Sequence, residues 1–367
     1  MLLFTPGPTP VPEDIRVAMA KETIHHRTSE FTNIFNETRE LLLDLIKSDE
    51  VVMLASTGTG AMEASVLNLC CKKALTINAG KFGERFSKIC KSFNIPYTEL
   101  VYEWNTPADP KDIKDVIKKD KNIDAIFIQI CESSGGLRHP VEEIAKIAKE
   151  INPDIMVVAD GITAVGVEPI SLFNIDAIIT GSQKALMLPP GLSIIGLSQK
   201  GVEKIGKGKG FYFNLASEIK KQKEGTTAYT AATTLIIGLR EILKNIKEIG
   251  LDTLYDQTKK RAQASRKALE AIGLKIYPKT PADAMSAVID EDADRIRDIL
   301  KRKYGVNIAG GQEHLKGKLF RINHMGFIEP YKAAWVLNAI EMALADLGRI
   351  RYDSVANKVF NEIYFRE

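Results

Sequence analysis

Two charged side chains follow predicted buried strands at positions where they could meet. Asp160 comes directly after the apolar run Ile155–Ala159, and Lys184 follows the run Ala177–Thr180 after three intervening residues. Because ligands of parallel sheets bind at the carboxyl ends of the strands, we expect both side chains to point into one crevice. Alone, Asp160 could cap a helix and Lys184 could be a solvated surface lysine. Together they indicate a reactive site.

A turn rich in glycine and hydroxyl residues follows another predicted strand, Glu50–Ala55. It comprises residues 56–60, with the sequence STGTG, and a helix is predicted after it. The backbone N–H groups of such a turn, together with the positive end of the helix dipole, can bind a phosphate. The turn differs from the dinucleotide motif GxGxxG because Glu63 occupies the third glycine position. It is not a Walker loop either, because no Gly-Lys-Ser/Thr follows.

A lysine, a carboxylate and a phosphate-binding turn are the three groups that pyridoxal phosphate chemistry needs. In that chemistry Lys184 would hold the cofactor as a Schiff base and would then move a proton from the substrate Cα. Asp160 would keep the ring nitrogen protonated, so that the ring accepts electrons. Phe82 follows the predicted strand Lys73–Asn78 and could stack on the ring or pack as a core residue.

The elements that must position these residues alternate between strands and helices. Continuous apolar strands separated by amphipathic helices predict an α/β fold, with a mostly parallel sheet covered by helices on both faces. Further strands are predicted at Ala125–Ile130 and Ser193–Leu197. The predicted helices are Ile15–Lys21, Phe31–Ile46, Phe82–Phe93, Pro110–Lys119 and Val141–Ile151.

A long helix from about Leu251 to Ile272 precedes a second region, in which a smaller α+β unit is predicted. Its elements are Ala284–Ile289, Ile296–Tyr304, Leu319–Ile322 and a closing helix, Tyr331–Leu347. The proline-rich opening predicts an extended arm. We therefore predict an N-terminal arm over residues 1–15, a large domain over residues 16–250 and a small C-terminal domain over residues 251–367.

Charge and composition argue against several other classes of protein. Fifty Lys and Arg against 47 Asp and Glu leave a net charge of +3, which gives no reason to expect a nucleic-acid partner. No stretch approaches the ~20 apolar residues of a membrane span, and the N-terminus lacks the basic region of a signal peptide. The cysteines, Cys70, Cys71, Cys90 and Cys131, show no CxxC spacing. We therefore expect reduced thiols, no metal site and a cytoplasmic location.

Seven segments, taken together, resemble a known family. They are TPGPTPVP, STGTGAMEA, NAGKFGER, ESSGG, VVADGITAVG, GSQKALMLPPG and LFRINHMG. The chain resembles the class V, fold-type I aminotransferases, which use pyridoxal 5'-phosphate, and within them the serine–pyruvate/alanine–glyoxylate branch. The segments follow the family order from end to end, and GSQKAL followed by PPG is highly specific. The resemblance implies a large domain with a mostly parallel sheet flanked by helices, and a smaller α+β C-terminal domain.

The resemblance also implies roles for individual residues around the cofactor. Lys184 would be the Schiff-base lysine and Asp160 the partner of the pyridinium nitrogen. Phe82 and Ile162 would lie on opposite faces of the ring. The remaining cofactor contacts would come from Thr57, Gly58, Thr59, Ser133, Gln183, Thr227 and Thr230.

Two further features of the family concern the subunit interface and the substrate. Thr227 and Thr230 match a segment that reaches the phosphate of the neighbouring subunit in a homodimer, although Ala231 replaces the usual proline. Arg321 matches the arginine that binds the substrate α-carboxylate, for which a planar guanidinium is well suited. Gly7 would bring its backbone close to the same carboxylate.

The resemblance implies a ping-pong aminotransferase. The amino donor would be serine, alanine or aspartate, and the acceptor would be glyoxylate or pyruvate. Three alternatives stay open: another class V enzyme, such as an aminoethylphosphonate transaminase or a cysteine desulfurase, an NAD-dependent dehydrogenase, and a non-catalytic protein. A desulfurase needs an exposed, mobile cysteine, and all four cysteines precede Asp160. The pair His25 and His26 could line the pocket or face solvent.

Overall fold

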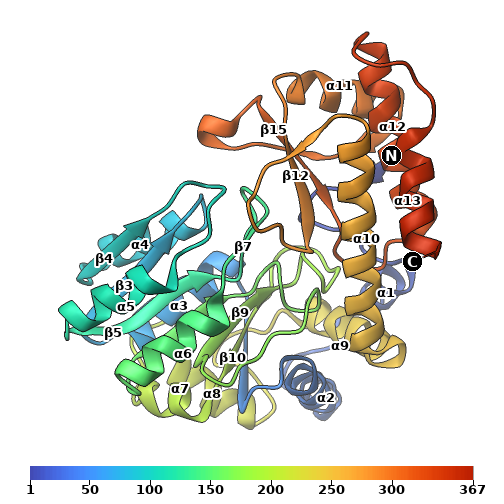
Figure 1. Cartoon of the computed structure of the whole chain (residues 1–367). Helices are drawn as coiled ribbons and strands as arrows, with labels where there is room; N and C mark the ends of the chain where they lie inside the picture. The colour runs from blue at the N-terminus through green and yellow to red at the C-terminus, as the bar shows by residue number, and fades with distance from the viewer. Residues whose placement is uncertain (367) are drawn as a thin grey trace.

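A computed structural model describes residues 1–366, and its core is formed by two sheets (Figure 1). The larger sheet has seven strands in the order β2-β10-β9-β8-β5-β3-β4. These strands are β2 (Glu50–Leu54), β3 (Lys73–Asn78), β4 (Tyr97–Val101), β5 (Ile123–Gln129), β8 (Met156–Asp160), β9 (Ala177–Gly181) and β10 (Ser193–Leu197). Strand β10 is antiparallel to both of its neighbours, β2 and β9, and the other pairs of adjacent strands in this sheet are parallel. The predicted mostly parallel α/β sheet is therefore confirmed.

Helices cover both faces of this sheet, as expected for a sheet whose strands are apolar on both sides. Alternation along β2 shows why, because Met53 packs on one face and Leu54 on the other. One face is covered by α1 (Glu13–Met19), α2 (Ser29–Ile46), α5 (Pro110–Lys119), α6 (Val141–Ile151) and α9 (Thr233–Ile249). The opposite face is covered by α3 (Gly58–Leu69), α4 (Gly83–Ser92), α7 (Gln199–Ile205) and α8 (Leu215–Lys223).

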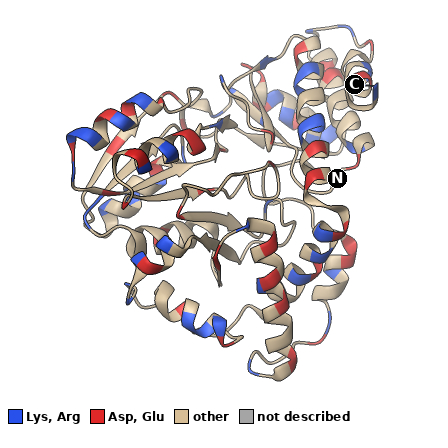
Figure 2. Ribbon diagram, turned by 60° about the horizontal axis from the view of Figure 1, so that its bottom comes forward, with Lys and Arg blue, Asp and Glu red and all other residues tan. Residues whose placement is uncertain are grey.

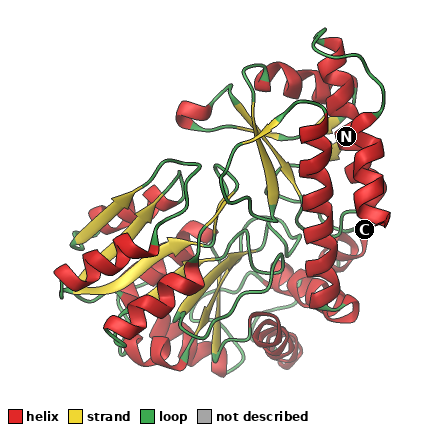
Figure 3. Cartoon of the chain, viewed as in Figure 1, coloured by secondary structure: helices red, strands yellow, loops and turns green. Residues whose placement is uncertain are grey.

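The second sheet is antiparallel and has four strands in the order β11-β12-β15-β14 (Figure 3). Its strands are β11 (Lys275–Ile276), β12 (Met285–Ile289), β14 (Ala309–Gly310) and β15 (Leu319–Asn323). The helices that share its apolar core are α10 (Leu251–Ala271), α11 (Ala293–Lys303), α12 (Pro330–Asp346) and α13 (Val355–Arg366). Short elements complete the chain: β6 (Cys131–Glu132), β7 (Leu137–Arg138), β13 (Val306–Asn307) and the 3₁₀ helix η1 (Glu313–Leu315).

The N-terminal arm joins this second unit before it reaches the large sheet. Strand β1 (Leu2–Leu3) pairs in parallel with β13, and Phe4 is buried in the apolar core around β15. The carbonyl of Phe4 accepts a hydrogen bond of 2.9 Å from the backbone N–H of Asn323. The division into an arm and two domains at residues 15 and 250 stays a prediction.

Charged residues of both signs alternate along the outer helices, whereas the strands of the large sheet carry few of them (Figure 2). This mixed pattern is that of solvated helix faces. Among residues 1–366, no helix combines the length and apolar character needed to span a membrane.

Candidate active site

Asp160 and Lys184 lie at the same edge of the large sheet. Asp160 is the last residue of β8, and Lys184 lies in the turn that follows the adjacent strand β9. Both side chains are buried, with exposed fractions of 4% and 9%. The pKa of each responds to the charge of the other, which places the carboxylate and the amine in one electrostatic environment.

The N-terminal arm crosses directly over Lys184. The Lys184 Nζ donates a hydrogen bond to the carbonyl of Pro6, and the Thr9 hydroxyl donates to the carbonyl of Lys184 at 2.7 Å. Gly7 has a φ of +106°, and a Cβ at this position would lie 2.7 Å from the Cδ of Lys184. Only glycine fits such a close approach in that backbone conformation.

Burial, and to a smaller extent the positive charge of Arg321, lowers the pKa of Lys184 to about 8. At pH 7 the neutral amine, which is the form that attacks a carbonyl, is therefore a minority, but a far larger one than for a lysine of ordinary pKa. Burial raises the pKa of Asp160 to about 7. A hydrogen bond of 2.9 Å from the backbone N–H of Ile162 acts in the opposite direction, because it stabilises the carboxylate. A cationic ring nitrogen beside Asp160 would restore its ionised form.

The predicted phosphate turn opens helix α3. The Thr57 backbone is extended, and its side chain makes no capping hydrogen bond, so the dipole and N–H groups of the first turn lack a side-chain cap. The side chain of Ile162 occupies the space where a Cβ on Gly58 would lie. Ile162 therefore lies against the turn, and Gly58 must be small.

Arg85 is a site residue that the sequence interpretation missed. Its Nη1 donates to the Thr59 hydroxyl at 2.9 Å, and its guanidinium lies 4.7 Å from the centre of the Phe82 ring. The spacing of three residues places Phe82 and Arg85 about one turn apart at the start of α4. The signal in the sequence that could have identified Arg85 is its position one helical turn after the aromatic residue Phe82. Through its contact with Thr59, Arg85 adds a positive charge beside the predicted phosphate-binding turn.

Ser133 and Gln183 approach the same region from two different loops. Ser133 is buried, and its carbonyl accepts a 2.6 Å hydrogen bond from the Nη1 of Arg321. The side-chain oxygen of Gln183 is buried and has no hydrogen-bond partner within residues 1–366. A buried polar atom without a partner is costly, so Gln183 suits a polar ligand.

Arg321 lies on β15 and is 7% exposed. Besides Ser133, the one acceptor of its guanidinium within residues 1–366 is the carbonyl of Gly310, at 3.2 and 2.7 Å. Neither Arg321 nor Lys184 forms an ion pair with a carboxylate in the described part of the chain. Buried cations are normally paired with an anion, so these two neighbouring cations favour an anionic ligand.

Arg261 is a third buried cation without a carboxylate, but its surroundings differ. Its guanidinium donates to the carbonyls of His324, Gly326 and Ile328 and to the hydroxyl of Thr258. It thereby fixes the loop after β15 to α10. Burial among these acceptors gives Arg261 a structural role.

Four other predicted residues lie away from these contacts. Thr227 and Thr230 lie between α8 and α9, where they line a small hollow with Ala55. No hydrogen bond of the described chain joins either threonine to Lys184 or Asp160. His25 is exposed, and its ring centre lies 4.7 Å from that of His26, which is half-buried. The roles predicted for Thr227 and Thr230 require another subunit and stay predictions.

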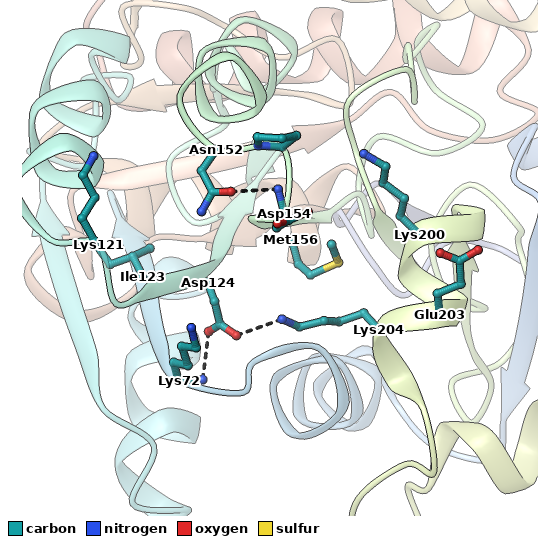
Figure 4. A pocket seen from close by; sticks show the side chains of 11 residues that line it. Lys72, Lys121, Ile123, Asp124, Asn152, Asp154, Met156, Lys200, Glu203 and Lys204 are labelled. Carbon is teal, nitrogen blue, oxygen red and sulfur yellow. Dashed lines mark hydrogen bonds and ion pairs between the residues drawn. The ribbon is translucent and has the colours of Figure 1, made fainter.

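A lysine-rich cleft of about 550 Å³ lies at the opposite edge of the large sheet, where β5 and β8 begin (Figure 4). Its lysines are Lys72, Lys121, Lys200 and Lys204. Lys204 pairs with Asp124 at 3.0 Å, and the backbone N–H of Lys72 donates to the same carboxylate. The other three lysines are exposed to solvent, so this cleft lacks the buried, unpaired groups of the first site.

Comparisons with known proteins identify the family of this chain. A family model described as "Aminotransferase class-V" matches residues 2–325. A Helicobacter pylori protein described as an uncharacterized aminotransferase is 51% identical over the full length of both chains. The serine–glyoxylate aminotransferase of Hyphomicrobium methylovorum is 31% identical and covers 94% of this chain and 90% of its own. The crystal structure of an aspartate aminotransferase from Thermus thermophilus has a TM-score of 0.89 and 31% identity, covering 94% of this chain and 99% of its own.

The geometry and the similarity point to the same chemistry. A buried lysine of lowered pKa, a buried carboxylate and an uncapped helix N-terminus fit the aldehyde, ring nitrogen and phosphate of pyridoxal phosphate. The unpaired Gln183 oxygen also fits a polar ligand. This chain belongs to the class V aminotransferases and is a fold-type I, pyridoxal-phosphate-dependent transaminase.

Proposed function

We propose that this enzyme transfers the amino group of a small amino acid to a small 2-oxo acid by a ping-pong mechanism. The donor is serine, alanine or aspartate, and the acceptor is glyoxylate or pyruvate. The observation that carries the proposal is Arg321, a buried guanidinium without a carboxylate partner beside a lysine of lowered pKa. The names of the Hyphomicrobium and Thermus relatives support serine, aspartate and glyoxylate as substrates.

The substrate α-carboxylate pairs with Arg321, because a planar guanidinium can donate two parallel hydrogen bonds to a carboxylate. Gly7, whose backbone lies against Lys184, brings the N-terminal arm to the same place. This pairing orients the substrate Cα–H bond toward Lys184. Lys184 holds the cofactor and then moves the proton away from Cα.

Bound pyridoxal phosphate supplies an electron sink for the charge that develops when the Cα–H bond breaks. Asp160 holds a proton on the ring nitrogen, and Phe82 and Ile162 enclose the two ring faces. The phosphate is bound by Thr57, Gly58 and Thr59, with Ser133 and Gln183 at the polar edge of the ring.

We also propose a homodimer in which Thr227 and Thr230 of one subunit reach the phosphate bound by the other. The adjoining surface supports this, because Phe211 is 83% exposed and packs on Tyr229, which stacks on Tyr212. An exposed aromatic cluster of this kind is typical of a protein interface.

We propose a cytoplasmic location as well. All four cysteines are free, which supports this location.

The cysteines do not favour a desulfurase. Cys131 is close enough to Lys184 for ionisation of its thiol to affect the pKa of the lysine. The thiol is only 5% exposed, however, and burial raises its pKa to about 12. Cys71 is exposed but lies just before β3, at the amino edge of the sheet. A desulfurase needs an exposed thiol of low pKa at the substrate.

The test begins with an absorbance spectrum of the purified protein before and after borohydride reduction, followed by a peptide map. We expect a yellow protein and a cofactor fixed covalently to Lys184 after reduction. The reaction is then assayed with serine, alanine and aspartate against glyoxylate and pyruvate. A protein that takes up no pyridoxal phosphate and is not labelled at Lys184 would overturn the proposal.

A further inference from the structure

Glu132 is a buried carboxylate that the proposed reaction does not use. It ends the short strand β6, just after β5, and it has no exposed surface. Its Oε2 accepts hydrogen bonds from the backbone N–H groups of Phe82 and Gly83, at 3.0 and 2.8 Å. Its Oε1 accepts from the backbone N–H and the hydroxyl of Ser134, at 3.0 and 2.6 Å. One carboxylate thus joins the loop after β3 to the loop after β5.

The surroundings of Glu132 are shaped around this carboxylate. A Cβ on Gly80 would lie 2.5 Å from the Cδ of Glu132, so only glycine leaves room for the side chain. The hydroxyl of Ser134, which donates to Glu132, also accepts a hydrogen bond from the backbone N–H of Lys81 at 3.2 Å. Within residues 1–366 no lysine or arginine forms an ion pair with Glu132. Burial raises the pKa of Glu132, and the hydrogen bonds from backbone N–H groups and one hydroxyl act against that rise and hold the carboxyl group in place.

The two joined loops carry different parts of the site. Phe82, whose ring contacts Arg85, lies in the first loop. Ser133, whose carbonyl accepts the hydrogen bond from Arg321, lies in the second. A shift of either loop would therefore move the wall beside the cofactor ring or the anchor of the arginine.

We propose that Glu132 is a positioning residue, whose carboxylate fixes Phe82 against the cofactor ring and Ser133 against Arg321. This inference rests on the proposed function, because it assumes that Phe82 and Arg321 face cofactor and substrate. In this proposal Glu132 itself touches neither the cofactor nor the substrate. It acts through the two loops that it holds together.

A glutamine at position 132 would keep the size and shape of the side chain but could not accept the same four hydrogen bonds. A carboxylate accepts at both oxygens, whereas an amide accepts at its oxygen and donates at its nitrogen. With the amide oxygen toward Phe82 and Gly83, the amide nitrogen would face the backbone N–H of Ser134. Two donors would then oppose each other, and one loop would shift or lose its partner.

The experiment compares Glu132→Gln with Glu341→Gln as a matched control. Glu341 on α12 is also a buried carboxylate, and it accepts from the backbone N–H groups of Asp353, Val355 and Ala356. Glu341 lies where α12 packs against α13, away from the two loops that Glu132 joins. We measure the dissociation constant of pyridoxal phosphate, the visible circular dichroism of the bound cofactor, and the thermal unfolding of each cofactor-free variant.

We expect Glu132→Gln to bind pyridoxal phosphate roughly tenfold more weakly and to give a reduced circular dichroism band. The control should unfold at a lower temperature but keep the dissociation constant and the band of the wild type. A Glu132→Gln variant that matches wild type in both cofactor readouts would overturn the inference. If that variant does not fold, Ser134→Ala replaces it, and we expect binding about threefold weaker. Unchanged binding by Ser134→Ala would then overturn the inference.

The two proposals fail in different ways. If wild type takes up no pyridoxal phosphate at Lys184, the proposed function is wrong. If wild type takes it up and the loop variants bind it equally well, only the role of Glu132 is wrong.

Discussion

The two edges of the large sheet both carry lysines, but they treat charge in opposite ways. At the amino edge, Lys204 pairs with Asp124, and Lys72, Lys121 and Lys200 face solvent. At the carboxyl edge, Lys184 and the facing Arg321 of β15 are buried, and within the described chain they donate only to backbone carbonyls. The number of lysines is greater at the amino edge, yet the proposed reactive site lies at the carboxyl edge.

Buried cations elsewhere in the chain show that pairing is the normal arrangement. Arg39 pairs with Glu50, and Lys149 pairs with Asp176 at 2.6 Å, with each side chain largely buried. A buried charge without an anion is expensive, so the chain keeps it only where a ligand supplies the anion or where many carbonyls surround it. The comparison teaches that burial without a partner, and not charge density, indicates the site.

The largest expected effect is that of Lys184→Ala. It removes the group that, in the proposed mechanism, holds the cofactor and moves the proton, so we expect kcat to fall by roughly 10⁴-fold. The matched change at the amino edge, Lys204→Ala, removes an ion pair with Asp124 and should leave kcat within about twofold. Steady-state assays of both variants check the comparison. Substantial activity in Lys184→Ala would break it.

Arg321→Lys should have the next largest effect. The charge is kept, but the planar fork that matches a carboxylate is lost. We expect kcat/KM for the amino donor to fall by about 100-fold, mainly through KM. An unchanged KM would show that the substrate carboxylate binds elsewhere.

The pH dependence of cofactor uptake should distinguish Lys184 from the exposed lysines. Its pKa is lowered from 10.5 to about 8, so the amine is mainly charged below pH 8 and mainly neutral above it. Only the neutral amine attacks the aldehyde. In the cofactor-free protein, the initial rate of pyridoxal phosphate uptake should therefore rise with pH and level off above about 8. A rate that still rises between pH 9 and 10 would contradict the lowered pKa.

The smallest effect on activity is expected for Asp124→Asn. Asp124 accepts hydrogen bonds from the backbone N–H groups of Cys71, Lys72 and Lys73. Its loss should lower the free energy of unfolding by about 1–3 kcal/mol while kcat stays within about twofold of wild type. Chemical denaturation and the standard assay check both parts. A large fall in kcat would mean that the two edges are coupled.

Much of the fold could be predicted because its strands are short, apolar and buried on both sides. The predicted strands at residues 50–55, 73–78 and 193–197 match β2, β3 and β10 almost to the residue. Strand β4 was missed because it lies at the sheet edge, and its five residues are half-buried or exposed. The reversed direction of β10 was also missed, since an apolar run has no direction.

The site could be predicted only in part. Asp160 and Lys184 follow strands, and the position after a strand is visible in a sequence. Arg85 and Glu132 lie in segments that were noticed, NAGKFGER and ESSGG, but their partners come from other loops. The lack of an ion pair between Arg321 and any carboxylate of residues 1–366 is a property of the folded chain alone. Spacing along the sequence does not reveal such long-range contacts.

The path of the N-terminal arm has a consequence for synthesis on the ribosome. The arm is made before the large sheet, but its partner strand β13 is made only when residues 306 and 307 are added. Pro6 reaches Lys184 from an arm whose start is anchored in the C-terminal core. A nascent chain that already contains every strand of the large sheet therefore still lacks the final enclosure of its reactive lysine. Synthesis of β13, rather than of the large sheet, therefore completes the anchor of the arm that covers Lys184.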